Sequence, residues 1–249
     1  MMNNAVNGLY FIAGGTGGIG SEVARRLRAR GAEVALAARN EARLEQRARE
    51  LGARSVPMDA TRPEVVTGAF DSVLGEGGRL IGVVNCIGTI LLKPAHLTSD
   101  EEWRTTVDTN LTTSFLLLRE AARRMMTTGG GAIVFCSTVA AARGLFNHEA
   151  IAAAKAGVEG LTRAAAATYA RYGIRVNCVA PGLVQTPLSQ FLTANEASRK
   201  ASVALHPLGR LGEPGDIASA ICWLLSPEQT WVTGQVLHVD GGLSTVQAR

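Results

Sequence analysis

The chain has 249 residues, of which 47% are hydrophobic and 18% charged, and its net charge is +4. This composition indicates one compact α/β domain, residues 1–249, with a large buried core. The arginines are spread along helical patterns without a basic, aromatic-interleaved stripe, so nucleic acid is not an expected partner. No apolar stretch is long enough to span a bilayer and no signal peptide is evident, so we expect a soluble cytoplasmic protein.

The four cysteines, Cys86, Cys136, Cys178 and Cys222, lie in or beside apolar segments. They form neither a C-x-x-C motif nor a Cys/His spacing typical of metal sites. We therefore expect free, buried thiols in a reducing compartment and no metal.

Short apolar runs alternate with amphipathic helical patterns along the whole chain. The runs are apolar on both faces, as in parallel strands that helices cover on both sides. The expected strands are 8–13, 33–38, 54–58, 80–85, 132–136, 174–179 and 235–239. The expected helices are 18–30, 41–51, 63–74, 100–126, 149–171 and 214–225. The pattern predicts a single-domain, Rossmann-type, doubly wound parallel sheet of seven strands, whose ligands bind at the carboxyl ends of the strands.

A glycine-rich loop, 13–20, joins the first strand to the first helix. Glycines let the backbone turn sharply and approach a pyrophosphate, and the helix N-terminus offers unpaired N–H groups. A loop that serves only as a turn is the weaker interpretation in this context. The predicted cofactor-binding residues here are Gly14, Thr16, Gly18, Ile19 and Gly20.

The second strand ends at Arg39 instead of an acidic residue that would bind the ribose hydroxyls of NAD. An arginine here can meet a 2′-phosphate, so the sequence predicts that NADP(H) is preferred over NAD(H). An ordinary surface arginine is the alternative. After the third strand, Asp59 and Ala60 are expected to meet the adenine. After the fourth strand, Asn85 and Gly88 begin and end a small-residue segment for the cofactor to lie against.

Together these motifs resemble the short-chain dehydrogenase/reductase family over essentially the whole chain. The glycine motif is Gly14-x-x-x-Gly18-Ile19-Gly20. The further matching motifs are Asn85-Cys86-Ile87-Gly88, Asp108-Thr109-Asn110-Leu111, Pro181-Gly182-Leu183-Val184-Gln185-Thr186 and Val239-Asp240-Gly241-Gly242. The resemblance implies a nicotinamide cofactor, with Pro181, Gly182 and Thr186 beside the nicotinamide. It also implies that the long helices 100–126 and 149–171 build the interfaces of a homo-oligomer, most simply a tetramer.

The resemblance further implies an active site of Asn, Ser, Tyr and Lys. Asn110 and Lys155 fall on the Asn and the Lys, which in the family anchors the cofactor ribose. Thr138 falls on the Ser, and Ser137 is the alternative if the alignment slips by one residue. The Tyr position holds Ile151, which has no proton to give. Of the three tyrosines, Tyr10 lies in the first strand, and Tyr169 and Tyr172 lie several turns beyond Lys155, so none should reach the nicotinamide.

Three alternatives for the missing phenol stay open. His148 precedes Ile151 by three positions and Lys155 by seven, so these residues share one helical face, and histidine is the commonest general acid. Water could donate the proton instead, with Lys155 and Thr138 setting the electrostatics. Finally, His148 could lie in the loop or cap the helix without a chemical role.

Residues 188–206 resemble the family's mobile substrate lid and mix apolar with basic side chains, including Arg199 and Lys200. We expect an NADP(H)-dependent oxidoreductase acting on a small-molecule ketone/secondary alcohol pair. A noncatalytic nicotinamide-binding protein, such as a sensor or a partner subunit, is the main alternative, and non-redox chemistry on the same scaffold is a weaker one. A 3-oxoacyl thioester, a polyketide-like ketone, a sugar and a steroid all remain open as substrates.

Overall fold

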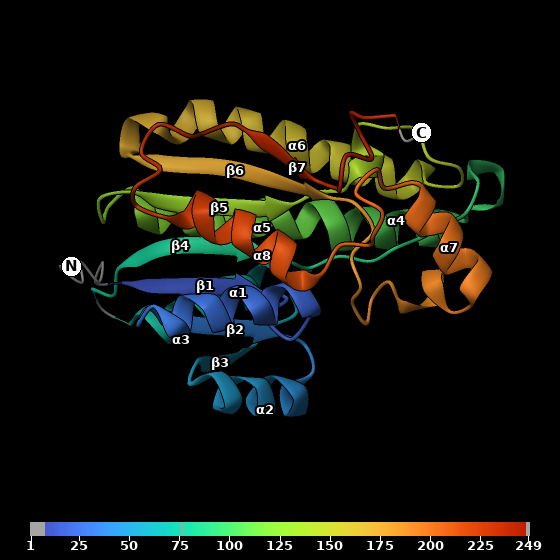
Figure 1. Cartoon of the computed structure of the whole chain (residues 1–249). Helices are drawn as coiled ribbons and strands as arrows, with labels where there is room; N and C mark the ends of the chain where they lie inside the picture. Colours follow the sequence, from blue (N-terminus) through green and yellow to red (C-terminus); the bar gives the residue numbers. More distant parts are fainter. Residues whose placement is uncertain (1–7, 76, 248–249) are drawn as a thin grey trace.

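The computed structural model of the chain describes residues 8–75 and 77–247, and its centre is a parallel β-sheet (Figure 1). The described residues form seven strands in the order β3-β2-β1-β4-β5-β6-β7, and every neighbouring pair is parallel. The strands are β1 Leu9–Ala13, β2 Glu33–Ala38, β3 Arg54–Pro57, β4 Leu80–Asn85, β5 Gly131–Cys136, β6 Ile174–Pro181 and β7 Val236–Val239. This order confirms the predicted doubly wound fold, with its switch point between β1 and β4.

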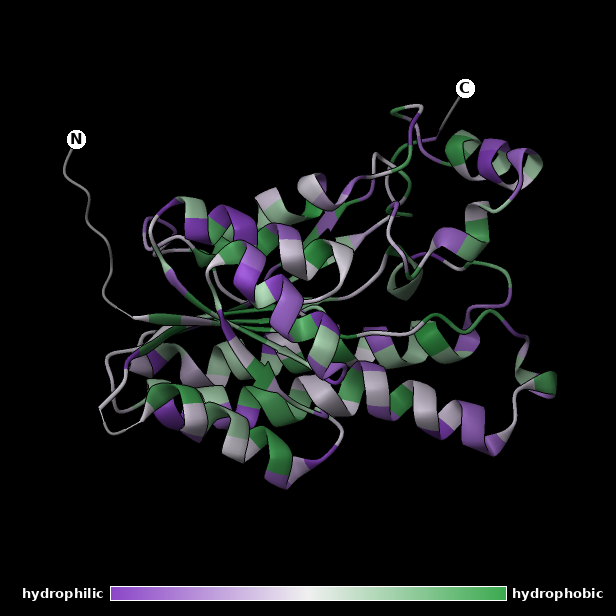
Figure 2. Ribbon diagram, turned by 90° about the horizontal axis from the view of Figure 1, so that it is seen from below, coloured by the Kyte–Doolittle hydropathy of each residue, from purple (hydrophilic) through white to green (hydrophobic). Residues whose placement is uncertain are grey.

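Helices cover both faces of the sheet. The main helices are α1 Gly18–Ala29, α2 Glu41–Leu51, α3 Pro63–Leu74, α4 Asp100–Val107, α5 Thr113–Met125, α6 Glu149–Tyr169, α7 Glu196–Ala204 and α8 Pro214–Leu225. The buried residues of α3, α5 and α6 share one apolar cluster, and those of α1, α2 and α8 share the other. In Figure 2 the strands are mostly green, and the helices on either side alternate between green and purple.

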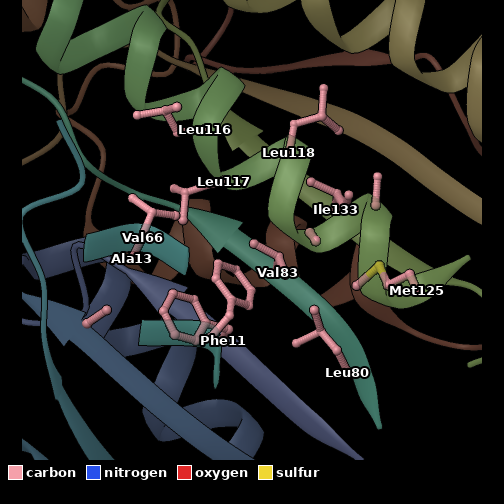
Figure 3. Close-up of a cluster of buried hydrophobic side chains, with 14 of the residues drawn as sticks. Phe11, Ala13, Val66, Leu80, Val83, Leu116, Leu117, Leu118, Met125 and Ile133 are labelled. Carbon is pink, nitrogen blue, oxygen red and sulfur yellow. The ribbon is translucent and has the colours of Figure 1, made fainter. Parts of the chain in front are cut away.

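Side chains of each strand alternate between these two clusters because a strand has a period of two. In β1, Phe11 faces the cluster of α3 and α5, whereas Tyr10 and Ile12 face that of α1 and α8. The rings of Phe11 and Phe70 stack with centroids 4.3 Å apart in the cluster that Figure 3 shows. The sheet is therefore covered on both sides, and only its ends are available to a ligand.

The predicted helix 100–126 is wrong as a single element. A π-helical turn, η2 (Asp108–Thr112), separates α4 from α5. Within it, the Asn110 side-chain amide donates to the Thr106 carbonyl at 2.9 Å, an acceptor that a regular helix reserves for a backbone N–H. The hydrophobic periodicity of the sequence cannot show that a side-chain N–H has replaced a backbone N–H as the donor.

The remaining differences from the sequence prediction lie at the ends of elements. The helix predicted over 149–171 leaves the α-helical form after Tyr169 and finishes as a 3₁₀ turn, Ala170–Tyr172. β6 runs on to Pro181, two residues further than predicted, because Pro181 is still paired with Val239 of β7. Ends of helices and strands are the part of an element that local pattern determines least.

Beyond the carboxyl ends of the strands lie α7 and the short 3₁₀ turn η5 (Gln190–Thr193), both in the segment predicted as a lid (Figure 1). No helix of the described residues combines the length and apolarity needed to cross a membrane.

Candidate active site

The glycine-rich loop begins where β1 ends and leads directly into α1. Gly14 has a φ of +76°, and a Cβ there would lie 2.8 Å from the carbonyl carbon of Cys86, so both backbone conformation and space require glycine. A Cβ on Gly20 would lie 2.5 Å from the Gly14 carbonyl oxygen. These contacts hold the loop tightly against β4 and against the first turn of α1.

The N-terminus of α1 is open to an anion. Its N-cap residue, Gly17, offers no capping side chain, and its first turn, which starts at Gly18, holds no acidic residue. Unpaired N–H groups and a helix dipole without a competing carboxylate fit a pyrophosphate. Ile19, in the same turn, lines the adjoining cavity. The loop and helix start therefore fit the phosphates of a dinucleotide.

Two arginines follow β2, one directly after the strand and one on α2. Arg39 is exposed at the end of β2, as predicted, and Arg43 of α2 donates to the Thr16 carbonyl oxygen at 3.3 Å. Arg43 was not singled out from the sequence, where it is one of several basic residues on an exposed helix. The two residues bring positive charge to the loop from two different elements.

Asp59 and Ala60 follow β3. Asp59 accepts hydrogen bonds from the Thr61 hydroxyl at 2.8 Å and backbone N–H at 3.1 Å. The Thr61 hydroxyl holds the pKa of Asp59 below its usual range, and the positive charge of Arg39 adds to this lowering. Ala60 is buried in the core, so only its backbone is left for a ligand.

Asn85 turns its side chain away from the cavity. It is buried, donates to Ser114 at 3.0 Å, and accepts from the Ile87 backbone N–H at 2.9 Å. Its side chain therefore holds the loop after β4 from the core side. Gly88, which has no side chain, lines the cavity with its backbone. A Cβ on Gly88 would lie 3.1 Å from Asn110 Oδ1 and 3.5 Å from Lys155 Nζ.

Asn110 is completely buried in the π-helical turn. Its Oδ1 accepts from the Thr89 backbone N–H at 3.1 Å, and its Nδ2 donates to the Thr89 hydroxyl at 2.9 Å. The π turn thus aims the Asn110 amide at the segment Gly88–Thr89, and it fixes that segment at the cavity wall.

Lys155 of α6 is buried, and its Nζ donates to the carbonyl oxygen of Cys136 at 2.8 Å. Burial lowers the pKa of Lys155, because the charged ammonium is poorly solvated there. The ammonium has donors left over for a further acceptor in the cavity, such as a ribose hydroxyl.

Ser137 and Thr138, at the end of β5, have different surroundings. The Ser137 hydroxyl donates to Glu159 at 2.8 Å and lies 3.3 Å from the Lys155 carbonyl oxygen, so it faces α6. The Thr138 hydroxyl accepts only a long bond, 3.4 Å, from the Ala140 N–H, which leaves its proton free. Both residues line the cavity, but the Thr138 hydroxyl is the one available to a ligand.

Ile151 and His148 line the same cavity as Lys155. The Ala152 N–H donates to the His148 carbonyl at 2.7 Å, so His148 already lies in register with α6. Its Nδ1 lies 2.7 Å from the Phe146 carbonyl, an acceptor, which places the ring hydrogen on Nδ1. The side chain makes no capping hydrogen bond with the helix. None of the three tyrosines, all among the described residues, lines this cavity.

The cavity has a volume of about 340 Å³ and joins the segments described above to the lid. Pro181, Gly182 and Thr186 line one wall, and Leu188, Leu192 and Leu205 of the predicted lid line another. Among the described residues that line the cavity, Lys155 is the one lysine, and none is an arginine, an aspartate or a glutamate. Arg199 and Lys200 are exposed on α7 and do not line it.

His206 was missed by the sequence reasoning. It is buried where the lid rejoins the domain, and its Nε2 accepts from the Leu183 N–H at 3.1 Å. Its Nδ1 donates to the Ser202 carbonyl at 2.8 Å. The imidazole therefore ties α7 to the loop after β6. A lone histidine within a variable lid carries no sequence signal for such a bridge.

Comparisons with known proteins agree with this geometry. A family model described as enoyl-(acyl carrier protein) reductase matches residues 13–244. The 3-oxoacyl-[acyl-carrier-protein] reductase FabG of Vibrio cholerae is 36% identical over 234 residues, covering 93% of this chain and 95% of the relative.

Two solved structures extend the comparison. A short-chain type dehydrogenase/reductase from Mycobacterium ulcerans superposes with a TM-score of 0.93 at 35% identity, over 97% of this chain and 91% of the other. ElxO with NADP bound superposes with a TM-score of 0.91 at 27% identity, over 97% and 100%. The chain belongs to the short-chain dehydrogenase/reductase family, whose members are nicotinamide-dependent oxidoreductases.

Proposed function

We propose that this protein is an NADP(H)-dependent oxidoreductase that interconverts a ketone and a secondary alcohol with an atypical proton donor. The observation that carries the proposal is the convergence of Lys155, Thr138 and His148 on one cavity beside the glycine-rich loop. When bound, the nicotinamide supplies or accepts the hydride. The chain's own residues orient the carbonyl, move the proton and exclude water.

Each polar residue of the cavity has a role that its contacts support. Lys155 holds the cofactor ribose with the N–H donors that the Cys136 carbonyl leaves free. The Thr138 hydroxyl donates to the substrate carbonyl oxygen. Asn110 is a positioning residue, because its amide is already bonded to Thr89.

His148 is the proposed proton donor. Because its Nδ1 carries a hydrogen bonded to the Phe146 carbonyl, Nε2 is the nitrogen that gains and loses the catalytic proton. The imidazolium gives the Nε2 proton to the carbonyl oxygen as the alcohol forms, and the reverse reaction returns it. Ile151 supplies only an apolar wall against which the substrate packs.

The preference for NADP(H) is supported by Arg39 and Arg43. Arg39 ends β2 where a ribose-binding carboxylate would stand in an NAD site, and Arg43 contacts the glycine-rich loop. Two guanidinium groups fit a 2′-phosphate through charge-assisted hydrogen bonds. Four free thiols fit the reducing cytoplasm as the compartment.

The substrate that the cavity fits best is neutral and apolar. Its lining beyond the cofactor wall is mostly aliphatic, and the polar side chains of Ser189 and His206 are already hydrogen-bonded within the protein. Lys155 is committed to the Cys136 carbonyl and the ribose. A carboxylate or phosphate placed among the aliphatic side chains, away from His148, would lose its hydration without gaining a partner, which is costly. The aliphatic lining residues on this side are Ile90, Leu92, Val139, Leu145, Leu188, Leu192, Leu205 and Leu243, and the polar ones are Thr89, Ser189, Ser202 and His206.

We further propose a homotetramer. Large apolar side chains are exposed on two separate surfaces, one on α4 and α5 and one around α8 and β7. On the first, Trp103 is 45% and Phe115 48% exposed; on the second, Trp223 is 46% and Trp231 97% exposed. We propose that each surface pairs with its own copy about a twofold axis and that the two axes intersect, which gives a closed assembly of four.

The direct test is NADPH oxidation with a panel of neutral aliphatic and alicyclic ketones, each paired with a carboxylated analogue. Wild type should oxidise NADPH with the neutral member of a pair and form one alcohol per NADPH consumed. His148→Ala should lower kcat by about 10²- to 10⁴-fold, the contribution typical of a general acid, and leave the NADPH Kd within about twofold.

His96→Ala is the matched control, because His96 is exposed and lies outside the cavity. This variant should leave both kcat and the NADPH Kd unchanged. Unchanged turnover in His148→Ala would show that water donates the proton. If wild type binds NADPH but turns over no ketone, the noncatalytic alternative is supported. The observation that favours this alternative is Ile151, which cannot donate a proton.

A further inference from the structure

Cys86 and Cys136 form a pair of thiols at the floor of the cavity. β4 and β5 are parallel neighbours in which Asn85 is opposite Phe135, so the next residues, Cys86 and Cys136, are also side by side. Their Sγ atoms lie 3.8 Å apart, both thiols are free, and both residues line the cavity.

The backbone at this position suits a disulfide. Neighbouring strands run about 4.8 Å apart, which lies within the Cα separation of about 4.4–6.8 Å that disulfides accept. The sulfurs need only approach one another by about 2 Å through side-chain rotation to reach bonding distance.

The surroundings also favour oxidation of this pair over the other two thiols. A hydrogen bond from Cys86 lowers the pKa of the Cys136 thiol, and the nearby Lys155 ammonium acts in the same direction. The same hydrogen bond raises the pKa of Cys86, so Cys136 is the thiol of the pair that ionises first. Burial raises the pKa of Cys178 and Cys222 as well, and neither of these residues lines the cavity. A thiolate is the nucleophilic form, so Cys136 is the thiol poised to react.

We propose that Cys86 and Cys136 are an oxidative modification site that takes small hydroperoxides and closes to a disulfide. The Cys136 thiolate attacks the terminal peroxide oxygen, the O–O bond breaks, and the leaving hydroxide or alkoxide is protonated to water or an alcohol, which leaves a sulfenic acid on Cys136. The Cys86 thiol then attacks the Cys136 sulfur and forms the S–S bond, and the sulfenic hydroxyl leaves with the thiol proton as water. The two thiols lose two electrons, and the peroxide gains them.

The cross-link would act on two contacts that build the cofactor site. The backbone of Cys86 packs against Gly14, where a Cβ would lie only 2.8 Å from the Cys86 carbonyl carbon. The carbonyl of Cys136 holds Lys155 Nζ at 2.8 Å. We expect the disulfide to weaken NADP(H) binding, and bound cofactor to shield the thiols. This effect on binding rests on the proposed function, whereas disulfide formation does not.

The test treats wild type with hydrogen peroxide, with and without saturating NADP⁺, and reads both intact mass and digested peptides. The expected product has lost two hydrogens and yields a peptide pair linked through Cys86 and Cys136. NADP⁺ should slow its formation. The oxidised protein should bind NADPH at least about tenfold more weakly, and dithiothreitol should restore binding.

Cys136→Ser should lose the linked product, whereas Cys222→Ser, a change on α8 outside the cavity, should retain it. A linkage that involves Cys178 or Cys222, or sulfonic acid without any disulfide, would overturn the proposal even if the serine variants failed to fold. Disulfide formation with unchanged NADPH affinity would overturn the effect on binding alone. Failure of reduced wild type to bind any nicotinamide nucleotide would instead count against the proposed function.

Discussion

At the scale of single residues, the proposed active site has Ile151 where the family resemblance implies a tyrosine, beside the polar residues expected around it. Lys155, Thr138 and His148 line one cavity with it. A binder without catalysis would need Lys155 for the ribose but would have no use for the free hydroxyl of Thr138. His148 is the N-cap residue of α6 and lines the same cavity as Ile151, three positions later, so its imidazole is the proposed replacement for the phenol.

Arg39 gives the sharpest test of cofactor choice. We expect Arg39→Asp to weaken NADPH binding about 10- to 100-fold, since one charge-assisted hydrogen bond contributes about 1.5–3 kcal/mol. NADH binding should improve or stay the same, because an aspartate can accept from the ribose hydroxyls. Fluorescence titration of both cofactors measures the ratio.

Arg49→Asp, on the last turn of the same helix as Arg43, is the matched control for net charge. It should leave the ratio of the two affinities unchanged. If Arg39→Asp and Arg49→Asp lost NADPH affinity equally, Arg39 would be an ordinary surface arginine.

Residue identity predicted the environments of some site residues better than others. The role of Gly14 could be predicted because a glycine-rich loop between a strand and a helix has one main physical use, which is to bind phosphates. Asn85 was not, because a loop asparagine can face ligand or core, and here Ser114 and Ile87 bind its side chain. His206 depends on partners in two distant segments, so no local pattern could reveal it.

At the scale of elements, the π turn between α4 and α5 positions the site most specifically. It rotates Asn110 toward Thr89, and its cause is a side-chain hydrogen bond to Thr106. Sequence periodicity sums over many residues, so it predicts a long helix and passes over one inserted residue. The π turn can be recognised only when the tertiary contacts of Asn110 are known.

The start of α8 carries a pH-dependent contribution to stability. Hydrogen bonds from Arg210 lower the pKa of Asp216 to about 2, and Asp216 also accepts from the Glu213 N–H at 2.8 Å. A carboxyl with a depressed folded-state pKa stabilises the fold above its unfolded pKa, about 4, and this stabilisation is lost as pH falls toward 2.

Asp216→Asn should therefore lower the free energy of unfolding by about 1 kcal/mol at neutral pH, a value discounted for the partial exposure of the pair. The difference from wild type should shrink as pH falls from about 4 to about 2. Urea unfolding at several pH values measures it, and a difference that is constant with pH would contradict the assignment.

At the scale of the whole molecule, the alternation of strands and helices was enough to predict the sheet. The five central strands are apolar on both faces because helices cover both, and the parallel order follows from the helices between strands. For the lid, the sequence predicted the residue range 188–206 but not the structure of the segment. How α7 closes over the cavity depends on the contacts of His206 and Leu205, which no period in the sequence encodes.

The assembly should have four times the chain mass by sedimentation velocity. Phe115→Glu places a charge on the exposed face of α5 and should shift the protein to smaller species. Phe191→Glu is the control, because Phe191 is exposed on η5 of the lid and belongs to neither proposed surface. A wild-type monomer would contradict the tetramer.

The measurement that tests the central claim most directly is NADPH oxidation by wild type, Ile151→Tyr and Ile151→Phe against the same neutral ketones. We predict measurable turnover by wild type and a faster rate for Ile151→Tyr, because a phenol beside Lys155 restores a second acid. Ile151→Phe, which adds the ring without the hydroxyl, should show no gain. An inert wild type beside an active Ile151→Tyr would contradict the account and identify the natural protein as a nicotinamide binder.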